Sequence, residues 1–268
     1  MLLILLFFFG KTVPEKTTAP ARPAAAAQPV TALTTADVVT KAKRSLGQAQ
    51  TTHILQLENS VVRGDVKAQQ IKVFKQLANL WGDTLSQASI GAFYFGEAAK
   101  LENSEKNLTF AAHLLLDNAM AETDAAMQTW QASSAKSLFD KALELNSTND
   151  SSKVGLGACY LFGNISASPM QGLQIIMEVA NRDTTNMYAQ MVLGLGGIKS
   201  GQLDKAIERF NKVVSKQPGN LEAIINLAEA YDRKGDKANA VKWYKISLNM
   251  LAIPEAKKEI ESRIKALQ

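Results

Sequence analysis

The feature that most constrains this chain is a pattern of two amphipathic helical segments that restarts after 34 residues, from 187 to 221. The first copy spans Met187–Asn220, and the second begins at Leu221. Gly194 in the first segment and Ala206 in the second are small enough to let two helix backbones approach closely. Because positions four apart share a helix face, Phe210 is expected to fill the space beside that contact. The pattern therefore predicts stacked helical hairpins.

The second copy, Leu221–Pro254, repeats the first position by position. Proline follows the second helix of both copies, at Pro218 and Pro254, and prevents that helix from continuing. The remaining positions of the second copy hold Leu227, Ala228, Tyr231, Gly235, Ala240 and Tyr244. This pattern resembles the tetratricopeptide repeat, a 34-residue helix-turn-helix unit with small and aromatic residues at fixed offsets. The resemblance implies an all-α solenoid of helix-turn-helix repeats wound into a right-handed superhelix.

Weaker copies of the pattern precede these two, and helices without the pattern flank the array. Thr35 is a suitable N-cap, and capping helices are expected at 36–46 and 51–62. About five repeats plus capping helices are thus predicted: caps within 35–70, repeats at 71–104, 105–149, 150–186, 187–220 and 221–254, and a charged cap at 255–268. A repeat array needs such polar caps to remain soluble.

Some segments depart from the repeat pattern. The second repeat contains an insertion, Ala121–Gln131, whose composition favours a helix. We expect a longer first helix or an extra helical turn there, with Trp130 exposed or packed on the neighbouring repeat. Gln190 and Lys153 stand where a large apolar residue is usual, and Gly197 stands where tyrosine is usual. These three residues are expected to loosen the packing locally.

The N-terminal region differs from the rest in composition. Residues 1–10 begin with MLLILLFFF, about half of the roughly 20 residues that a spanning helix needs. They are interpreted as a signal or anchor remnant whose start lies upstream, with a signal peptide or a chance apolar tail as alternatives. Residues 11–34 form a predicted disordered linker rich in Thr, Pro and Ala. The combination of this apolar start, the linker and the five-repeat array resembles membrane-anchored repeat proteins of Bacteroidota. A periplasmic array is therefore expected, with a secreted or cytoplasmic location as the alternative.

Composition argues against several classes of function. The net charge of +5 and pI of about 9.1 are mild, and lysines alternate with glutamates rather than forming the basic stripe typical of nucleic-acid binding. His53 and His113 are the only histidines, and no His/Cys cluster has metal-ligand spacing. Cys159 lies in an apolar helical segment and is interpreted as a buried structural thiol. Since no nucleophile elbow or phosphate loop occurs, we predict a non-enzymatic protein without cofactor or metal.

The resemblance implies a concave groove lined by the first helix of each repeat. The groove positions carried over from the family change from basic through apolar to acidic, which suits an extended or helical peptide with central apolar anchors. The predicted groove residues are Lys72, Lys75, Asn79, Thr109, His113, Leu116, Val154, Ala158, Leu161, Tyr188, Met191, Leu195, Ile198, Glu222, Ile225, Glu229 and Asp232.

Two alternatives at this surface stay open. Lys75 and Asn79 match the first pair of a carboxylate clamp found in some family members, but a solvated helix face is the preferred interpretation, because Phe110, Ser151 and Gly155 stand at the remaining clamp positions. The apolar stripe Met191–Leu195–Ile198 is either a binding surface or core covered by another helix.

Two functions therefore remain. The first is an adaptor or scaffold that binds a peptide or helix of a protein partner, in envelope assembly, secretion or cytochrome maturation as similar bacterial arrays do. The second is a structural protein that forms a homo-oligomer through the groove or through residues 121–131.

Overall fold

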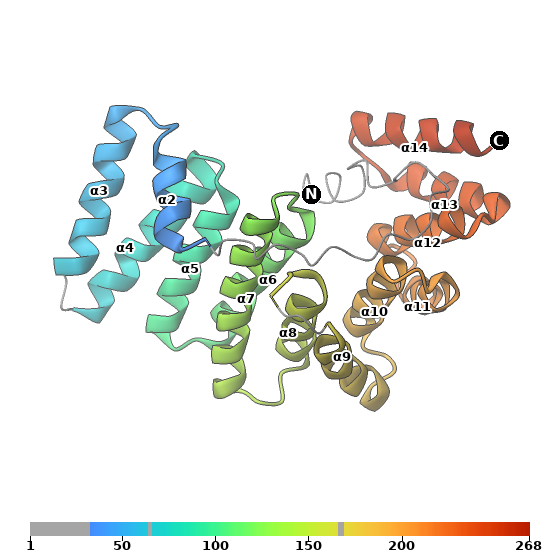
Figure 1. The fold of residues 1–268 in the computed structure, drawn as a ribbon, viewed down its shortest axis with the longest axis horizontal. Coiled ribbons are helices and arrows are strands. Elements are labelled where there is room, and N and C mark those ends of the chain that lie inside the picture. Colours follow the sequence, from blue (N-terminus) through green and yellow to red (C-terminus); the bar gives the residue numbers. More distant parts are fainter. Residues whose placement is uncertain (1–32, 64–65, 166–168) are drawn as a thin grey trace, which may run out of the picture. The chain divides into compact units, whose positions relative to one another are not determined.

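The computed structural model describes residues 33–63, 66–165 and 169–268, and all regular elements in these ranges are helices (Figure 1). The predicted all-α architecture of helix-turn-helix repeats is confirmed. The chain divides into two compact units, residues 1–169 and 170–268, which we call the first unit and the second unit. Residues 1–32, which include the predicted anchor and most of the predicted linker, lie outside the described part of the chain.

The first unit consists of successive helices, each contacting the next along the chain from α3 onward. Its helices are α2 (Thr35–Lys43), α3 (Gln48–Arg63), α4 (Lys67–Asn79), the π-helix η1 (Leu80–Thr84), α5 (Ala88–Glu102), α6 (Glu105–Ala121), α7 (Ala125–Leu145) and α8 (Asp150–Phe162).

The second unit continues the same alternation of helices and turns. It contains α9 (Met170–Arg182), α10 (Met187–Lys199), α11 (Leu203–Lys216), α12 (Leu221–Lys234), α13 (Lys237–Met250) and α14 (Pro254–Leu267). The predicted third repeat, 150–186, is thus divided, because α8 belongs to the first unit and α9 to the second.

Polar caps start the first helix of four repeats. Ser104, Asn149, Asn186 and Asn220 each accept a hydrogen bond from a backbone N–H in the first turn of α6, α8, α10 and α12, respectively. A side-chain oxygen at this position satisfies one of the donors that a helix N-terminus leaves unpaired. These four residues are the ones at which the sequence pattern ends one repeat and begins the next.

The start of the first unit differs slightly from the prediction. The N-cap of α2 is Thr34 rather than Thr35, and Thr34 forms a reciprocal capping box with Asp37. Leu33 packs against the core of the first unit. Leu33 and Thr34 therefore belong to the folded unit, although the sequence assigns them to the linker 11–34.

The core of the first unit contains two buried tryptophan side chains among aliphatic ones. Trp81 and Ile54 are fully buried, and Trp130 exposes only 5% of its surface. The Nε1 of Trp130 donates to the Oγ1 of Thr35 at 3.2 Å, and its ring lies 6.0 Å from that of Phe93. Of the two positions predicted for Trp130, the structure shows the packed one. The inserted residues lengthen both helices of the second repeat, α6 and α7.

Close approach of helices in the second unit depends on glycine. A Cβ atom at Gly194 would lie 2.5 Å from the Phe210 ring, so that ring packs directly on the α10 backbone. A Cβ atom at Gly197 would lie 3.0 Å from the Cβ of Ala206. The expectation that Gly197 loosens the packing is wrong, because glycine at this position brings α10 and α11 into contact.

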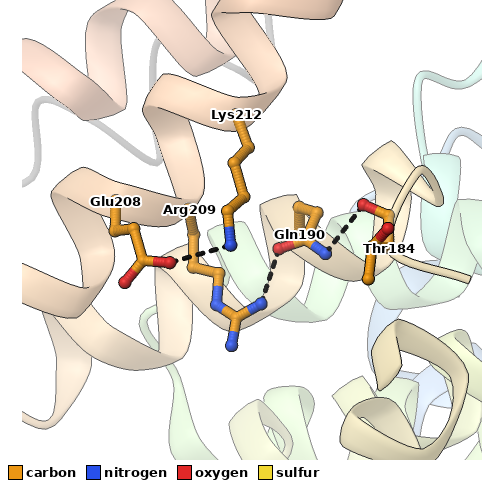
Figure 2. Close-up of polar contacts among 5 residues, drawn as sticks. All are labelled: Thr184, Gln190, Glu208, Arg209 and Lys212. Atoms are coloured by element: carbon orange, nitrogen blue, oxygen red, sulfur yellow. Dashed lines mark hydrogen bonds and ion pairs between the residues drawn. The ribbon is translucent and has the colours of Figure 1, made fainter. Parts of the chain in front are cut away.

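Gln190 is also better accommodated than the sequence predicts. It is buried on α10, where its Oε1 accepts from the Arg209 guanidinium at 2.7 Å and its Nε2 donates to the Thr184 carbonyl at 3.3 Å (Figure 2). Beside it, Lys212 pairs with Glu208 at 2.8 Å. Because both ends of the Gln190 amide have partners, the polar residue links α11 to the turn before α10 rather than loosening the core.

Candidate functional site

In the first unit, the predicted groove residues on α4 are exposed. Lys72, Lys75 and Asn79 all lie at the surface of this helix. Lys75 pairs with Glu102 at 2.5 Å, and Glu102 also accepts from the Asn107 amide at 2.7 Å. These contacts lower the pKa of Glu102. Lys75 on α4 is therefore linked through Glu102 on α5 to Asn107 on α6. A partner's carboxylate would have to replace Glu102 as the ion-pair partner of Lys75.

The predicted residues on α6 already have partners on α8. Thr109 hydrogen-bonds Ser152 at 2.8 Å, and the Nε2 of His113 hydrogen-bonds Ser151 at 2.8 Å. The His113 ring also packs edge-on against Phe139, 5.0 Å away. Burial lowers the pKa of His113 to about 4, so the ring is neutral at physiological pH. These two residues join neighbouring repeats, which reduces what they can offer to a partner.

The remaining predicted residues of the first unit contribute little accessible surface. Leu116, Val154 and Ala158 are buried, and Leu161 is half-buried. Leu116, Val154 and Ala158 are therefore core residues of α6 and α8, whereas the assignment of Leu161 to the groove stays a prediction.

Two exposed apolar residues on α6 are absent from the predicted groove residues. Phe110 exposes 55% and Leu114 37% of its surface, one helical turn apart. Phe110 also contacts Phe95 on α5, with ring centroids 5.7 Å apart. The sequence could have indicated this pair, because α6 carries apolar residues on more than one face. Phe110 and Leu114 lie outside the stripe that forms the core, which consists of Leu108, Ala111, Ala112 and Leu115.

In the second unit, α10 and α12 lie side by side and carry the predicted apolar and acidic residues. Tyr188 and Ile198 on α10 are partly accessible. On α12, Glu222, Glu229 and Asp232 are also partly accessible, and Glu229 pairs with Arg233 at 2.5 Å. This face thus combines one aromatic and one aliphatic side chain with three carboxylates.

The centre of the predicted apolar stripe is buried. Met191 and Leu195 each expose 7% of their surface, and Ile225 exposes 5%. Of the two alternatives for this stripe, burial favours core for Met191 and Leu195, whereas Ile198 keeps some access. A groove running continuously from the first repeat to the fifth crosses the boundary between the two units and stays a prediction.

Catalytic chemistry has little support among the described residues. Within the ranges 33–63, 66–165 and 169–268, no three His, Cys, Asp or Glu side chains come together in a way that would hold a metal ion. Cys159 is buried, and burial raises the pKa of its thiol, which disfavours the nucleophilic thiolate. In the same ranges, no helix is both long and apolar enough to cross a membrane.

Comparison with known proteins supports the repeat assignment in the second unit. Residues 198–247, from the end of α10 to α13, match the family model of the tetratricopeptide repeat. No curated protein matches the sequence.

Several solved structures are similar. That of YrrB, described as a TPR protein with an unusual peptide-binding site, is 17% identical, with 80% of this chain and 98% of that chain covered and a TM-score of 0.43. A structure of MamA is 20% identical, with 70% and 97% covered and a TM-score of 0.44. MamA from Desulfovibrio magneticus RS-1 is also 20% identical, with 70% and 96% covered and a TM-score of 0.44.

Proposed function

We propose that this protein is a non-enzymatic scaffold that binds a peptide or helix of a protein partner along the first helices of its repeats. The observation that carries the proposal is the exposed pair Phe110 and Leu114 on α6. A large aromatic side chain that remains exposed next to an aliphatic one is typical of the anchor that a partner buries on binding.

The charges around these helices support selective recognition. In the first unit, α4 adds exposed Lys72 and Lys75. In the second unit, α12 adds Glu222, Glu229 and Asp232 beside the partly accessible Ile198. Charges of opposite sign at the edges of an interface mainly set orientation and association rate, whereas buried apolar anchors supply affinity. Each surface by itself therefore favours a partner segment whose charges are opposite in sign to its own.

Site-specific photo-crosslinking tests this proposal. A photoreactive phenylalanine analogue replaces Phe110 in one variant and Leu145, an exposed residue at the end of α7, in a matched control. We expect a discrete crosslinked partner from position 110 and none from position 145. Adding Leu114→Glu to the first variant is expected to abolish the product. Equal crosslinking from positions 110 and 145 would contradict the proposal.

The same experiment separates the scaffold from the self-associating alternative. A product of twice the chain mass from position 110 identifies a second copy as the occupant. The other surface considered for self-association, the insertion Ala121–Gln131, is a weaker candidate, because Trp130 and Gln131 are buried within the first unit.

A membrane location for this scaffold is part of the proposal. The apolar residues 1–10 would tether the array, with the repeats on the periplasmic side, where envelope assembly, secretion or cytochrome maturation would supply the partner. Carbonate extraction of membranes tests this: the chain is expected to stay with the membrane, and a variant that lacks residues 1–10 is expected to be released. Release of both would leave a secreted or cytoplasmic scaffold.

A further inference from the structure

A groove on the first unit lies between helices α5 and α7, away from the predicted groove residues. One end is a pocket of about 340 Å³ between the start of α2, α5 and α7, and a second hollow of about 370 Å³ follows along α7. The two share Lys100, Ser133 and Ser137 and are therefore continuous. We call this feature the α5/α7 groove; it extends from Trp130 to Glu144.

Glycine again determines the geometry. A Cβ atom at Gly96 on α5 would lie 2.7 Å from the Cδ1 of Leu138, so these two helices meet closely at that point. Leu138 also lines the pocket, whereas Ser133 and Ser137 on α7 are exposed. Leu138 and the two serines thus line the groove at the point where α5 and α7 approach each other closely at Gly96.

The lining selects an uncharged occupant. Phe93 and Trp130 provide an aromatic wall at the α2 end, and hydroxyl groups of Ser133, Ser134 and Ser137 follow along α7. The charged side chains along the groove are paired with each other: Lys100 with Glu97 at 2.7 Å, Lys136 with Asp140 at 2.6 Å and Lys141 with Glu144 at 2.6 Å. Aromatic and hydroxyl groups together suit an extended proline-containing peptide, whose backbone carbonyls accept hydrogen bonds and whose conformation is largely preformed.

We propose that the α5/α7 groove is the docking site of this chain's own residues 26–32, AAQPVTA. Leu33 itself lines the pocket at the α2 end, so the preceding residues begin at the mouth of the groove. The segment 26–32 contains no charged residue and has Pro29 near its centre. Its chemistry therefore matches a groove whose charges are already paired.

The lengths also match. From Trp130 to Glu144, α7 rises by about 21 Å at 1.5 Å per residue. Seven residues in the polyproline II conformation span about 22 Å at 3.1 Å per residue. A segment of this length is therefore long enough to reach from Leu33 to the far end of the groove, and the proposed docking would bring position 26 next to Glu144.

Disulfide trapping in the full chain tests this placement. One variant carries Ala26→Cys and Glu144→Cys, and a control carries Ala26→Cys and Arg44→Cys. Arg44 is exposed and follows α2, at most about 17 Å from Leu33 by helical rise, so an unattached segment reaches it at least as readily as Glu144. We expect the 26–144 disulfide to form within one chain about ten times faster than the 26–44 disulfide.

A blocking substitution sharpens the result. Ser137→Trp fills the groove and is expected to slow the 26–144 disulfide at least about fivefold, whereas Gln56→Trp, at an exposed position on α3, leaves it unchanged. Equal rates for the two cysteine pairs would overturn the proposal even if Ser137→Trp fails to fold. A 26–144 disulfide formed only between chains would also overturn it, because the occupant would then be a second copy.

Discussion

The hairpins α4–α5 and α10–α11 both depend on glycine, but glycine meets a different neighbour in each. In the first unit, a Cβ atom at Gly91 would lie 2.7 Å from the backbone of Gly82. In the second unit, a Cβ atom at Gly194 would meet the side chain of Phe210. The contact between Gly91 and Gly82 joins two backbones, so a change of side-chain rotamer cannot relieve a clash there. The contact between Gly194 and Phe210 joins a backbone to a side chain, which a substitution can make smaller.

The comparison shows that one packing problem has two solutions in this chain. The match to the family model, residues 198–247, lies in the unit where aromatic residues pack at the usual positions, such as Phe210. The first unit instead combines the π-helix η1 with a core built around Trp81 and Trp130. A repeat architecture can therefore persist where its sequence pattern has weakened.

The largest effect is expected from Gly91→Ala. The alanine side chain would favour the helix by about 1 kcal/mol, but its clash with the Gly82 backbone in η1 and with the Ala78 carbonyl at the end of α4 forces this segment away from α5. We expect a net loss of about 3 kcal/mol in the free energy of unfolding, measured by urea denaturation. Gly219→Ala is the control, since nothing lies within 4 Å of a Cβ atom there. Equal free energies of unfolding for Gly91→Ala and Gly219→Ala would contradict a tight backbone contact at Gly91, and with it the difference between the two hairpins.

Gly194→Ala is expected to cost about 2 kcal/mol, because the added methyl group displaces the Phe210 ring. Trimming that ring with Phe210→Leu makes room, so the double variant is expected to lose at least about 1 kcal/mol less than the sum of the single losses. Urea denaturation of the two single variants and the double variant measures this difference. Additive losses would mean that the ring and the glycine are not in direct conflict.

His113 predicts a pH dependence in the first unit. Burial lowers its pKa from 6.5 to about 4, so the unfolded chain binds the proton first as the pH falls. Stability is therefore unaffected above about pH 6.5 and is lost progressively between 6.5 and 4. Compared with His113→Gln, the unchanged chain is expected to lose about 2 kcal/mol more between pH 7 and 4, measured by denaturation at each pH. Parallel pH profiles would contradict a half-buried ring that stays neutral in the folded protein.

Gln190→Leu restores the usual apolar residue on α10 but removes the acceptor of Arg209. We expect a loss of about 1 kcal/mol in thermal unfolding, because Arg209 is only partly buried and can recover some hydration. The double variant Gln190→Leu with Arg209→Leu is expected to be more stable than Gln190→Leu alone. If Gln190→Leu alone raises stability, the hydrogen bonds in Figure 2 contribute less than apolar packing.

The smallest effect is expected from Lys75→Ala. In its ion pair with Glu102, the Lys75 side chain exposes 45% and the Glu102 side chain 20% of its surface, and surface pairs of this kind contribute about 0–1 kcal/mol. The unfolding midpoint is therefore expected to stay nearly constant, while the rate of association with an acidic partner falls. A large loss of stability would make Lys75 a structural residue rather than part of a binding surface.

The sequence predicts the repeats better than the binding surface. Helix starts follow local capping, so Ser104, Asn149, Asn186 and Asn220 are recognisable without tertiary information. Burial of a polar or small residue depends on its neighbour in another helix, and for that reason the sequence alone does not predict how Gln190 and Gly197 pack.

The groove positions are subject to the same limit. Family offsets place Met191 and Leu195 on a binding face, but those offsets do not show which residues another helix covers. Exposure of Phe110 likewise depends on what packs beside α6, and this information lies outside the repeat pattern.

The most direct test of the scaffold is the affinity for the partner captured at position 110. Titration calorimetry would compare the unchanged chain with Phe110→Ser, Leu114→Ser and a control, Leu145→Ser, all first shown to unfold at the same temperature. We predict at least about tenfold weaker binding for the two α6 variants and no change for the control. Affinities within about twofold for all four proteins would contradict the claim that the first helices of the repeats form the binding surface.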